Sequence, residues 1–517
     1  EFTGGNQQQI GAFNGSIRSP ENLHTVPSYL DWGSCKQAGV LSSPEIQDFS
    51  ILDNGSFLIL ATFTGGNDGG ALLSGDPFQR HDSALMEFSP NGTCYSALVF
   101  THMVGSNSYS ITQRVHDDYH GTGPHSLFVL NDNYLIIGGT LGSAAWGHPH
   151  ASFAGVINKT EERGEYIFLA KFDRSSSRII DYIIFETSGH PNPSAYGLKV
   201  GIHPHTFTNS TEIAFAINLY ANSGQSNTGG SIDINGTSYS AMVSGTARSE
   251  NILVRMTHNL SVIESNEIPS TSYDDGNIRF LESGVVTSLT GSPGVGFSLE
   301  YLFPGQQQWS GTSNVDTMCM NGNSYTLPHY IMPLDAHSIA WPCAMSTGHN
   351  SPTAKLIIKR LNVTSGIVHE HDIGNLTNGH DNQLSGGGFA ISADRMIVSL
   401  RIGSGDSFIS PNVSLYTSNA AIDINLTTNS STVIPLDDEL SSISFRQPFH
   451  SVESLRGGTD EGIVRPKCQL GVSFACIGST RNSFSIYELD QDDDTHANRV
   501  DAFPFDNTQH SDVDLDG

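Results

Sequence analysis

The sequence predicts an all-β protein, a six-bladed β-propeller, and three observations support this prediction. The chain has 517 residues, which is more than a single hydrophobic core usually holds together. It therefore needs several domains or one closed repeat architecture. Gly, Ser, Thr and Asn are abundant and charged residues make up only 15%, which suits short strands joined by turns. A pattern of two hairpins also recurs along the chain.

Each repeat begins with an inner strand, a turn and a second strand, in which apolar and polar residues alternate at period two. The copies begin at Asp48, His125, His205, Asn277 and Gly388, and a degraded sixth copy begins at His450. The second half of each repeat is another hairpin, as in DSALMEFSPNGTCYSALVF. Four strands cannot bury their own faces, whereas closing several such units into a ring buries every face and leaves few open edges.

The expected organisation is an extended N-terminal arm at 1–28, the propeller at 29–489 and a short acidic tail at 490–517. We expect a composite last blade built from YLDWGSCK, which starts at Tyr29, and NSFSIYELD, which starts at Asn482. The unit from Asn277 to Ile373 is the longest, and we place its insertion GQQQWSGTSNVDTMCMNGNSY on the surface. A seven-bladed ring or a two-sheet sandwich would show similar strand spacing.

Glycosylation sequons of the N-x-S/T type indicate an extracellular, secreted or cell-surface protein. They occur at Asn14, Asn54, Asn91, Asn158, Asn209, Asn235, Asn259, Asn362, Asn375, Asn412, Asn425 and Asn429. Asn54, Asn91 and Asn235 each start an Asn-Gly pair between alternating apolar runs, where a tight turn would carry a glycan into solvent. We expect most of these sites to be occupied.

The cysteines form an even set of six, which suits disulfide pairing in an oxidising compartment. Their positions suggest the pairs Cys35–Cys94, Cys319–Cys343 and Cys468–Cys476, and the alternative is six buried free thiols. No run of about 18 apolar residues is present to span a bilayer. The chain starts at Glu1 without a signal peptide, which we interpret as a mature product whose leader was removed.

The formal charge of −28 disfavours a nucleic-acid partner and points towards cations. In the tail, oxygen ligands fall at positions 1, 3, 5, 9 and 12 of a loop, a spacing that predicts bound calcium. The loop consists of Asp490, Asp492, Asp494, the carbonyl of His496, Asn498 and Asp501, and a second, incomplete loop contains Asp512, Asp514 and Asp516. Thr495 stands where the first loop would normally have Gly to make its sharp turn. The second loop stops at Gly517 before it is complete, so we expect the natural chain to continue. The alternative is a solvated acidic tail without an ion.

The repeat alignment also predicts a polar ring around the central axis. Its members are Asp48, His125, His205, Asn277 and His450. Such a ring could hold a cation or bind a small anionic or sugar ligand, and the alternative is a water-filled channel. No nucleophile elbow, phosphate-binding loop or helical zinc motif is visible, so the sequence predicts a protein that is not an enzyme.

Two segments resemble known families. LAKFDRSSS and LVRMTHNLS look like the FVAKLDxxG signature of bacterial-type β-propeller repeat proteins of cell surfaces. VDAFP followed by DxDxDG resembles thrombospondin type 3-like calcium repeats, which implies that Asp490, Asp492, Asp494, Asn498 and Asp501 are ligands of one loop.

The expected function is that of a structural or adhesion glycoprotein. In one version it is the self-assembling subunit of an extracellular filament, and its N-terminal arm adds a strand to a neighbour. A frayed terminus is the alternative for the arm. A carbohydrate-binding or carbohydrate-processing propeller that uses its axial face is the second hypothesis, and a receptor-type module with protein ligands is a third.

Overall fold

The computed structural model contains strands and turns, and no helix, in the part of the chain that it describes. The described residues are 9–15, 23–29, 44–52, 54, 56–64, 81–89, 94–100, 102–104, 123–142, 151–154, 156–159, 165–188, 198–221, 230–241, 248–269, 278–292, 296–311, 319–321, 324–326, 331–346, 353–377, 388–401, 407–410, 413–416, 419–434, 467–469, 475–480 and 483–490. Within them, no helical segment has the length and hydropathy needed to cross a membrane.

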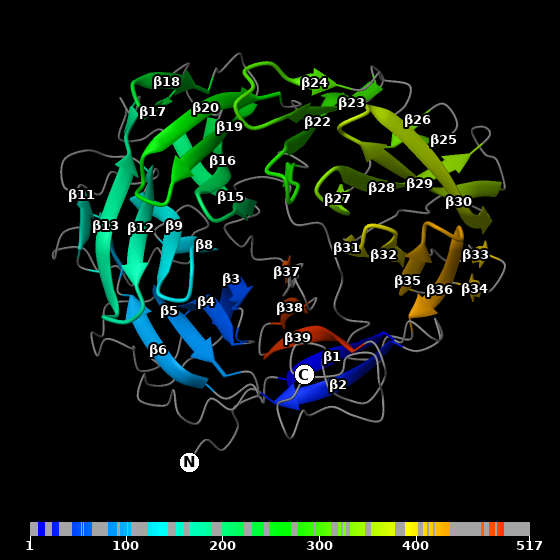
Figure 1. Ribbon diagram of the computed structural model, residues 1–517, viewed down its shortest axis with the longest axis horizontal. Coiled ribbons are helices and arrows are strands. Elements are labelled where there is room, and N and C mark those ends of the chain that lie inside the picture. Colours follow the sequence, from blue (N-terminus) through cyan, green and yellow to red (C-terminus); the bar gives the residue numbers. More distant parts are fainter. Residues whose placement is uncertain are drawn as a thin grey trace.

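Seven sheets follow one another around a ring and form the blades of a β-propeller (Figure 1). Blade 1 consists of β3 (Pro44–Ile51), β4 (Phe57–Thr64), β5 (His81–Phe88) and β6 (Cys94–Phe100). Blade 2 consists of β8 (Gly123–Val129), β9 (Tyr134–Gly142), β12 (Glu165–Asp173) and β13 (Arg178–Phe185). Blade 3 consists of β15 (Leu198–Thr208), β16 (Glu212–Ala221), β19 (Arg248–Thr257) and β20 (Val262–Ile268).

The next three blades repeat this antiparallel order. Blade 4 consists of β21 (Arg279–Phe280), β22 (Val286–Ser292), β23 (Gly296–Leu302) and β24 (Ser310–Gly311). Blade 5 consists of β27 (Met332–Pro333), β28 (Ser338–Ser346), β29 (Thr353–Asn362) and β30 (Ile367–Thr377). Blade 6 consists of β31 (Gly388–Ser392), β32 (Arg395–Arg401), β35 (Asn419–Asn425) and β36 (Ser430–Ile434).

Blade 7 joins the two ends of the chain. The sheet order is β2 (Leu23–Tyr29), β1 (Gln9–Gly15), β39 (Ser483–Asp490), β38 (Ala475–Thr480) and β37 (Lys467–Gln469). Of the two segments predicted for this blade, NSFSIYELD supplies β39, whereas YLDWGSCK lies outside the described residues after Tyr29. β1 pairs with β39 in parallel, and Figure 1 shows these terminal strands side by side. Residues 9–15 and 23–28, expected in an extended arm, therefore lie in the ring.

Some shorter strands are additional to the four-stranded blades. β7 (His102–Val104), β10 (Ala151–Phe153) and β11 (Ile157–Lys159) form one small sheet, and β14 (Thr187–Ser188), β17 (Ser231–Ile234) and β18 (Thr237–Ser240) form another. β25 (Cys319–Asn321) and β26 (Ser324–Thr326) extend blade 5 on one side, and β33 (Ser407–Ser410) and β34 (Val413–Tyr416) extend it on the other.

The blade number corrects the sequence prediction of six. The long unit from Asn277 to Ile373 contains two blades, because blade 5 has an inner strand of only two residues, Met332–Pro333. Its Gly/Gln-rich insertion supplies the outer strand of blade 4, Ser310–Gly311, and the Trp309 Nε1 donates a hydrogen bond to the Glu267 carbonyl of blade 3.

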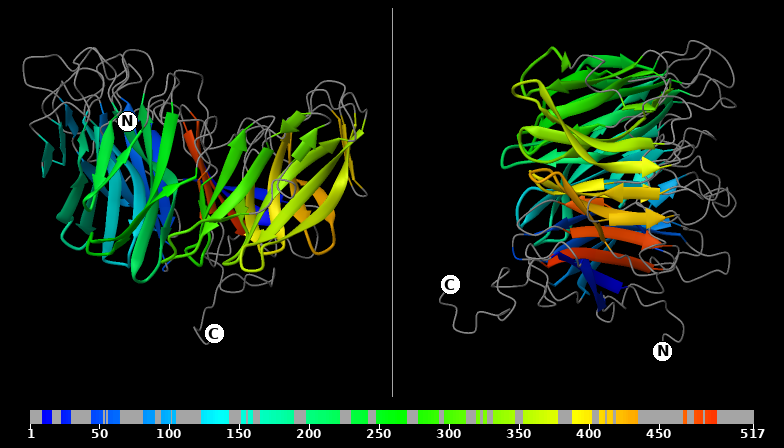
Figure 2. Two further views of the ribbon diagram at one scale, coloured as in Figure 1. Left: turned by 90° about the horizontal axis from the view of Figure 1, so that it is seen from above. Right: turned by 90° about the vertical axis from the view of Figure 1, so that its right-hand side faces the viewer.

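Hydrophobic packing lies between successive blades, which explains why each strand carries apolar residues on both faces. The alternating residues of one blade meet the opposite face of the next in separate buried clusters for blades 1–2, 2–3, 3–4, 4–5 and 5–6. Between blades 2 and 3, for example, the rings of Phe128 and Phe215 meet edge to face, with centroids 5.8 Å apart. Figure 2 shows the blades from the side, as sheets packed face to face.

Polar contacts supplement this packing near the hairpin turns. The Arg174 Nε lies 2.9 Å from the Glu87 Oε1 of blade 1. The Lys171 Nζ donates to the Asn259 Oδ1 of blade 3 at 3.0 Å, and Arg360 lies 2.9 Å from Asp394 of blade 6. Each of these contacts joins one blade to its neighbour.

Candidate functional site

The first strand of each of blades 1–6, and β37 of blade 7, lie nearest the centre of the ring (Figure 1). Contacts join these strands in succession from β37 through β3, β8, β15, β21 and β27 to β31. Three of them are interrupted by β-bulges at corresponding places. The pairing shifts between Ile46 and Asp48 in β3, between Pro124 and Ser126 in β8, and between Ile202 and Thr206 in β15. Because bulges turn side chains out of the regular alternation and often occur next to functional sites, this inner rim is the candidate site.

Asp48 is a buried connector between two blades. Its carboxylate accepts hydrogen bonds from the Phe49 N–H at 2.9 Å and from the Leu127 N–H at 2.7 Å. Leu127 belongs to β8, so the bond links the inner strands of blades 1 and 2. The Asp48 side chain is only 8% exposed, and these backbone contacts give it a structural role at the rim.

The histidine pair of β15 lies in the widest of the three bulges. His203 is buried and His205 is partly buried, and their ring centroids are 5.5 Å apart. The His205 N–H donates to the His203 Nδ1 at 3.3 Å. Two imidazoles are common metal ligands, but no group of three or more potential ligands gathers around any point in the described part of the chain.

The remaining predicted ring members are placed as follows. Counted from the hairpin turn, His205 corresponds to Asp48 and to Ser126, whereas His125 is the extra residue of the bulge in β8. The sequence alignment was therefore one residue out of register at His125. The side chain of His125, and Asn277 and His450 entirely, lie outside the described residues.

Sequence reasoning missed Arg279, which is 6% exposed on the inner strand of blade 4. Its Nη1 donates to the Ile278 carbonyl at 2.8 Å, and burial lowers the pKa of the guanidinium to about 9. The signal was present in the repeat, because the corresponding residues of the first three blades are Ser50, Phe128 and Phe207. A cation at this position breaks the pattern.

Several predicted sequon asparagines occupy exposed turns. Asn54, Asn209, Asn235, Asn259, Asn375 and Asn429 are exposed, and Asn362 and Asn425 are half-buried. The Asn-Gly turn is confirmed at Asn235, where Ile234 pairs with Thr237 and both turn residues have positive φ, 53° and 81°. The side chains of Asn14, Asn91, Asn158 and Asn412 lie outside the described residues.

Of the predicted cysteines, Cys35 lies outside the described residues, and the side chain is described only for Cys343; the calcium prediction falls almost entirely outside the described part. Cys343 is buried and disulfide-bonded, and Cys468 lies directly opposite Cys476 across the β37–β38 hairpin. Cys319 begins β25, which pairs in parallel with β28, the strand that contains Cys343. Asp490 ends β39, and the other tail residues, from Asp492 to Asp516, are not described.

Comparisons with known proteins add little to this geometry. The chain matches no protein family and no curated protein. Among solved structures it is similar to the β-propeller domain of the Trilobed protease from Pyrococcus furiosus, at 7% identity and a TM-score of 0.38, over 85% of this chain and 91% of that one. It is also similar to acylaminoacyl peptidase from Pyrococcus horikoshii, at 8% identity and a TM-score of 0.33, over 89% of this chain and 66% of that one.

A third similar structure is a puromycin hydrolase, at 9% identity and a TM-score of 0.25, over 91% of this chain and 61% of that one. The sequence prediction that this chain is not an enzyme is contradicted by such neighbours, and we withdraw it. Similarities this remote carry no argument for a particular reaction either. The propeller fold itself rests on the sheet topology described above.

Proposed function

We propose that this chain is an extracellular, N-glycosylated propeller with a structural or adhesive role. The observation that carries the proposal is the placement of the sequons. In a four-stranded antiparallel blade, the turns between strands one and two and between strands three and four lie on the same face of the ring, here called the hairpin face. Among the described residues, the sequons in or beside these turns are Asn54, Asn209, Asn259, Asn362, Asn425 and Asn429.

The local geometry at these turns suits glycan attachment. The Oδ1 atoms of Asn54, Asn209 and Asn362 accept the backbone N–H of the residue two positions later, the Ser or Thr of the sequon, at 2.8–3.0 Å. Asn425 makes the same Asx turn with Thr427 at 2.9 Å. Because the carbonyl end of each amide makes this contact, the Nδ2 atom, which takes the glycan, is directed away from the turn.

Site-resolved glycopeptide mass spectrometry of the native protein tests this proposal, and blade 2 provides a matched control. Asn131 lies in the equivalent first turn, is exposed, and accepts the Asn133 N–H at 2.9 Å in the same Asx turn, but it lacks Ser or Thr two positions later. We expect glycans at Asn54, Asn209 and Asn362 and none at Asn131. Unmodified asparagine at all the hairpin-face sequons would overturn the proposal.

Self-association is proposed to use the rim of blade 7. β2 is the last strand of that sheet, so its outer edge carries backbone groups that can pair with a strand of a second copy. The loose resemblance of the LAKFDRSSS and LVRMTHNLS segments to cell-surface repeats supports the same setting; in the structure they form the β12–β13 and β19–β20 hairpins. Electron microscopy of native material is expected to show ordered assemblies, and monodisperse single particles would contradict this part.

Carbohydrate binding or processing at the axial side is a second candidate function. The bulges of β3, β8 and β15 favour it, because they direct polar side chains, including the His203–His205 pair, out of the regular strand pattern at the inner rim. Titration with neutral and acidic saccharides, followed by saturation-transfer NMR, tests it. Binding that persists unchanged when His203 and His205 are both replaced by glutamine would remove this site from consideration.

A further inference from the structure

The interface between blades 4 and 5 contains a buried cation that has no carboxylate partner among the described residues. Arg279 projects from β21 on the face that also carries Leu281 and Leu289, whose neighbours are the apolar residues of blade 5. Its one hydrogen bond there goes to the carbonyl of its own neighbour, Ile278. A buried charge without a partner is costly, so proteins normally pair it.

The same protein shows how a buried arginine is compensated when no ligand is needed. Arg255, which is 1% exposed, lies 3.1 Å from the Glu212 carboxylate and 2.7 Å from the Glu264 carboxylate, and it also donates to the Gly284 carbonyl. Two carboxylates and a carbonyl thus surround one guanidinium. Arg279 has no equivalent arrangement among the described residues, so a bound anion is one way to balance its charge.

A second unsatisfied donor lies across the interface. Trp341 is 2% exposed, and its indole Nε1 has no hydrogen-bond partner in the structure. Counted from the hairpin turns, Arg279 corresponds to Phe128 and Trp341 corresponds to Phe215. Since Phe128 and Phe215 meet across the interface of blades 2 and 3, Arg279 and Trp341 occupy the facing positions in the interface of blades 4 and 5.

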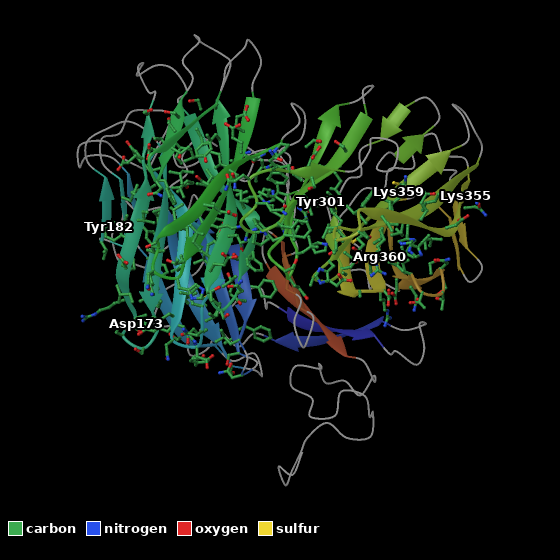
Figure 3. The ribbon with its side chains drawn as sticks, turned by 45° about the horizontal axis from the view of Figure 1, so that its top comes forward. Asp173, Tyr182, Tyr301, Lys355, Lys359 and Arg360 are labelled. Atoms are coloured by element: carbon green, nitrogen blue, oxygen red, sulfur yellow. The ribbon has the colours of Figure 1, made fainter. Side chains whose placement is uncertain are left out.

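The surroundings of this pair are positively charged. Lys359 is the cross-strand neighbour of Trp341, so both side chains are on the same face of blade 5. Lys359 is buried and lies 3.0 Å from the carboxylate of Glu370, which is 52% exposed and belongs to the outer strand β30. Figure 3 shows Lys359 on blade 5, beyond Tyr301 of blade 4. Two buried cations and an indole N–H therefore share one interface.

We propose that Arg279 and the Trp341 N–H bind a carboxylate-bearing ligand between blades 4 and 5, on the axial side. A guanidinium can hold both oxygens of a carboxylate, and an indole N–H supplies a further donor to the same group. The tryptophan ring next to these donors would also pack against the body of the ligand. This inference does not depend on the proposed function and can fail independently of it.

Titration of the full glycoprotein with sodium acetate, followed by saturation-transfer NMR and by thermal unfolding against sodium chloride of equal ionic strength, tests the site. Arg279→Met should weaken acetate binding about tenfold to hundredfold, because charge-assisted hydrogen bonds are lost. Trp341→Phe keeps the aromatic ring and removes only the donor, so a smaller loss is expected. Arg178→Met, at an exposed arginine of β13, is the matched control and should bind like the wild type.

Glucuronate and glucose separate the possible sources of the carboxylate. Tighter binding of glucuronate than of acetate would support a sugar acid as the ligand, whereas binding of acetate alone would support a small free carboxylate. Glucose binding as strong as that of glucuronate would overturn the proposal. The proposal would also be overturned if acetate did not bind to the wild type, or if it bound equally well to Arg279→Met. If Arg279→Met does not fold, Trp341→Phe still decides the question, because the proposal requires it to weaken binding.

Discussion

Replacing Arg279 with methionine should stabilise the protein in anion-poor buffer, whereas the same replacement at Arg255 should destabilise it. Both side chains are buried, at 6% and 1% exposure, and methionine fills a similar volume in each case. The two sites differ in their partners. Arg255 lies between the carboxylates of Glu212 and Glu264, and Arg279 has no carboxylate partner in the described structure.

The magnitudes follow from the electrostatics of each site. Burial lowers the pKa of Arg279 to about 9, which corresponds to a penalty on the charged form of up to about 5 kcal/mol. Losing the hydrogen bond to the Ile278 carbonyl costs about 1 kcal/mol, so a net gain of about 1–4 kcal/mol is expected from Arg279→Met. Arg255→Met would leave two partly buried carboxylates unpaired and should cost about 3–5 kcal/mol.

Equilibrium unfolding in urea, an uncharged denaturant that keeps the buffer poor in anions, gives the free energies of unfolding of both variants and the wild type when it is followed by circular dichroism. The difference in free energy of unfolding between the wild type and Arg279→Met should also become smaller above about pH 9. In that range native Arg279 releases its proton before the unfolded chain does, so its penalty is present below about pH 9 and shrinks as the pH rises. A destabilised Arg279→Met, alongside a destabilised Arg255→Met, would show that Arg279 is compensated and would refute this reasoning.

Three further predictions concern packing, the inner rim and the tail. Gly138→Ala should destabilise the folded protein by about 1–3 kcal/mol in thermal unfolding. The reason is that a Cβ at this position would lie 2.7 Å from the Ile202 Cδ1 and 2.9 Å from the Leu169 Cδ2. An unchanged melting temperature would show that blades 2 and 3 can move apart. Asp48→Asn should cost about 1–3 kcal/mol in denaturant unfolding, because one of the two N–H donors of Phe49 and Leu127 loses its carboxylate acceptor; no loss would mean that the link between blades 1 and 2 is dispensable. We propose that the tail loop predicted from the sequence binds calcium in calorimetry and that replacing Asp492 and Asp494 together with asparagine abolishes this binding; an absent calcium signal, or unchanged binding in the variant, would exclude the loop.

The fold class could be predicted from the sequence because strand alternation and the repeat are local patterns. The hairpins that start at Asp48, His125 and His205 each became the first two strands of a blade. The fifth blade was missed because its inner strand, Met332–Pro333, is too short to show alternation. The closing blade combines the two ends of the chain, and a parallel pairing of β1 with β39 leaves no local signature.

The candidate site was less predictable, because it depends on contacts between blades. The alignment found the inner rim at Asp48 and His205, but bulges of different size shifted the register at His125. Arg279 could have been noticed as a cation among Ser50, Phe128 and Phe207, since these residues occupy the same place in successive repeats. Within the described structure Arg279 has no carboxylate partner, unlike Arg255, and this difference depends on three-dimensional packing that no sequence pattern reports.

The placement of the sequons on the hairpin face means that the two faces of the ring would differ in their surface. With glycans at Asn54, Asn209, Asn259, Asn362 and Asn429, a hydrated sugar layer would keep any flat partner away from that side. Rings could then not stack face to back into a column, since every contact in such a column would need one covered side. Growth of a polymer would have to proceed through the rim, where β2 offers an edge, and the opposite face would remain open to other molecules.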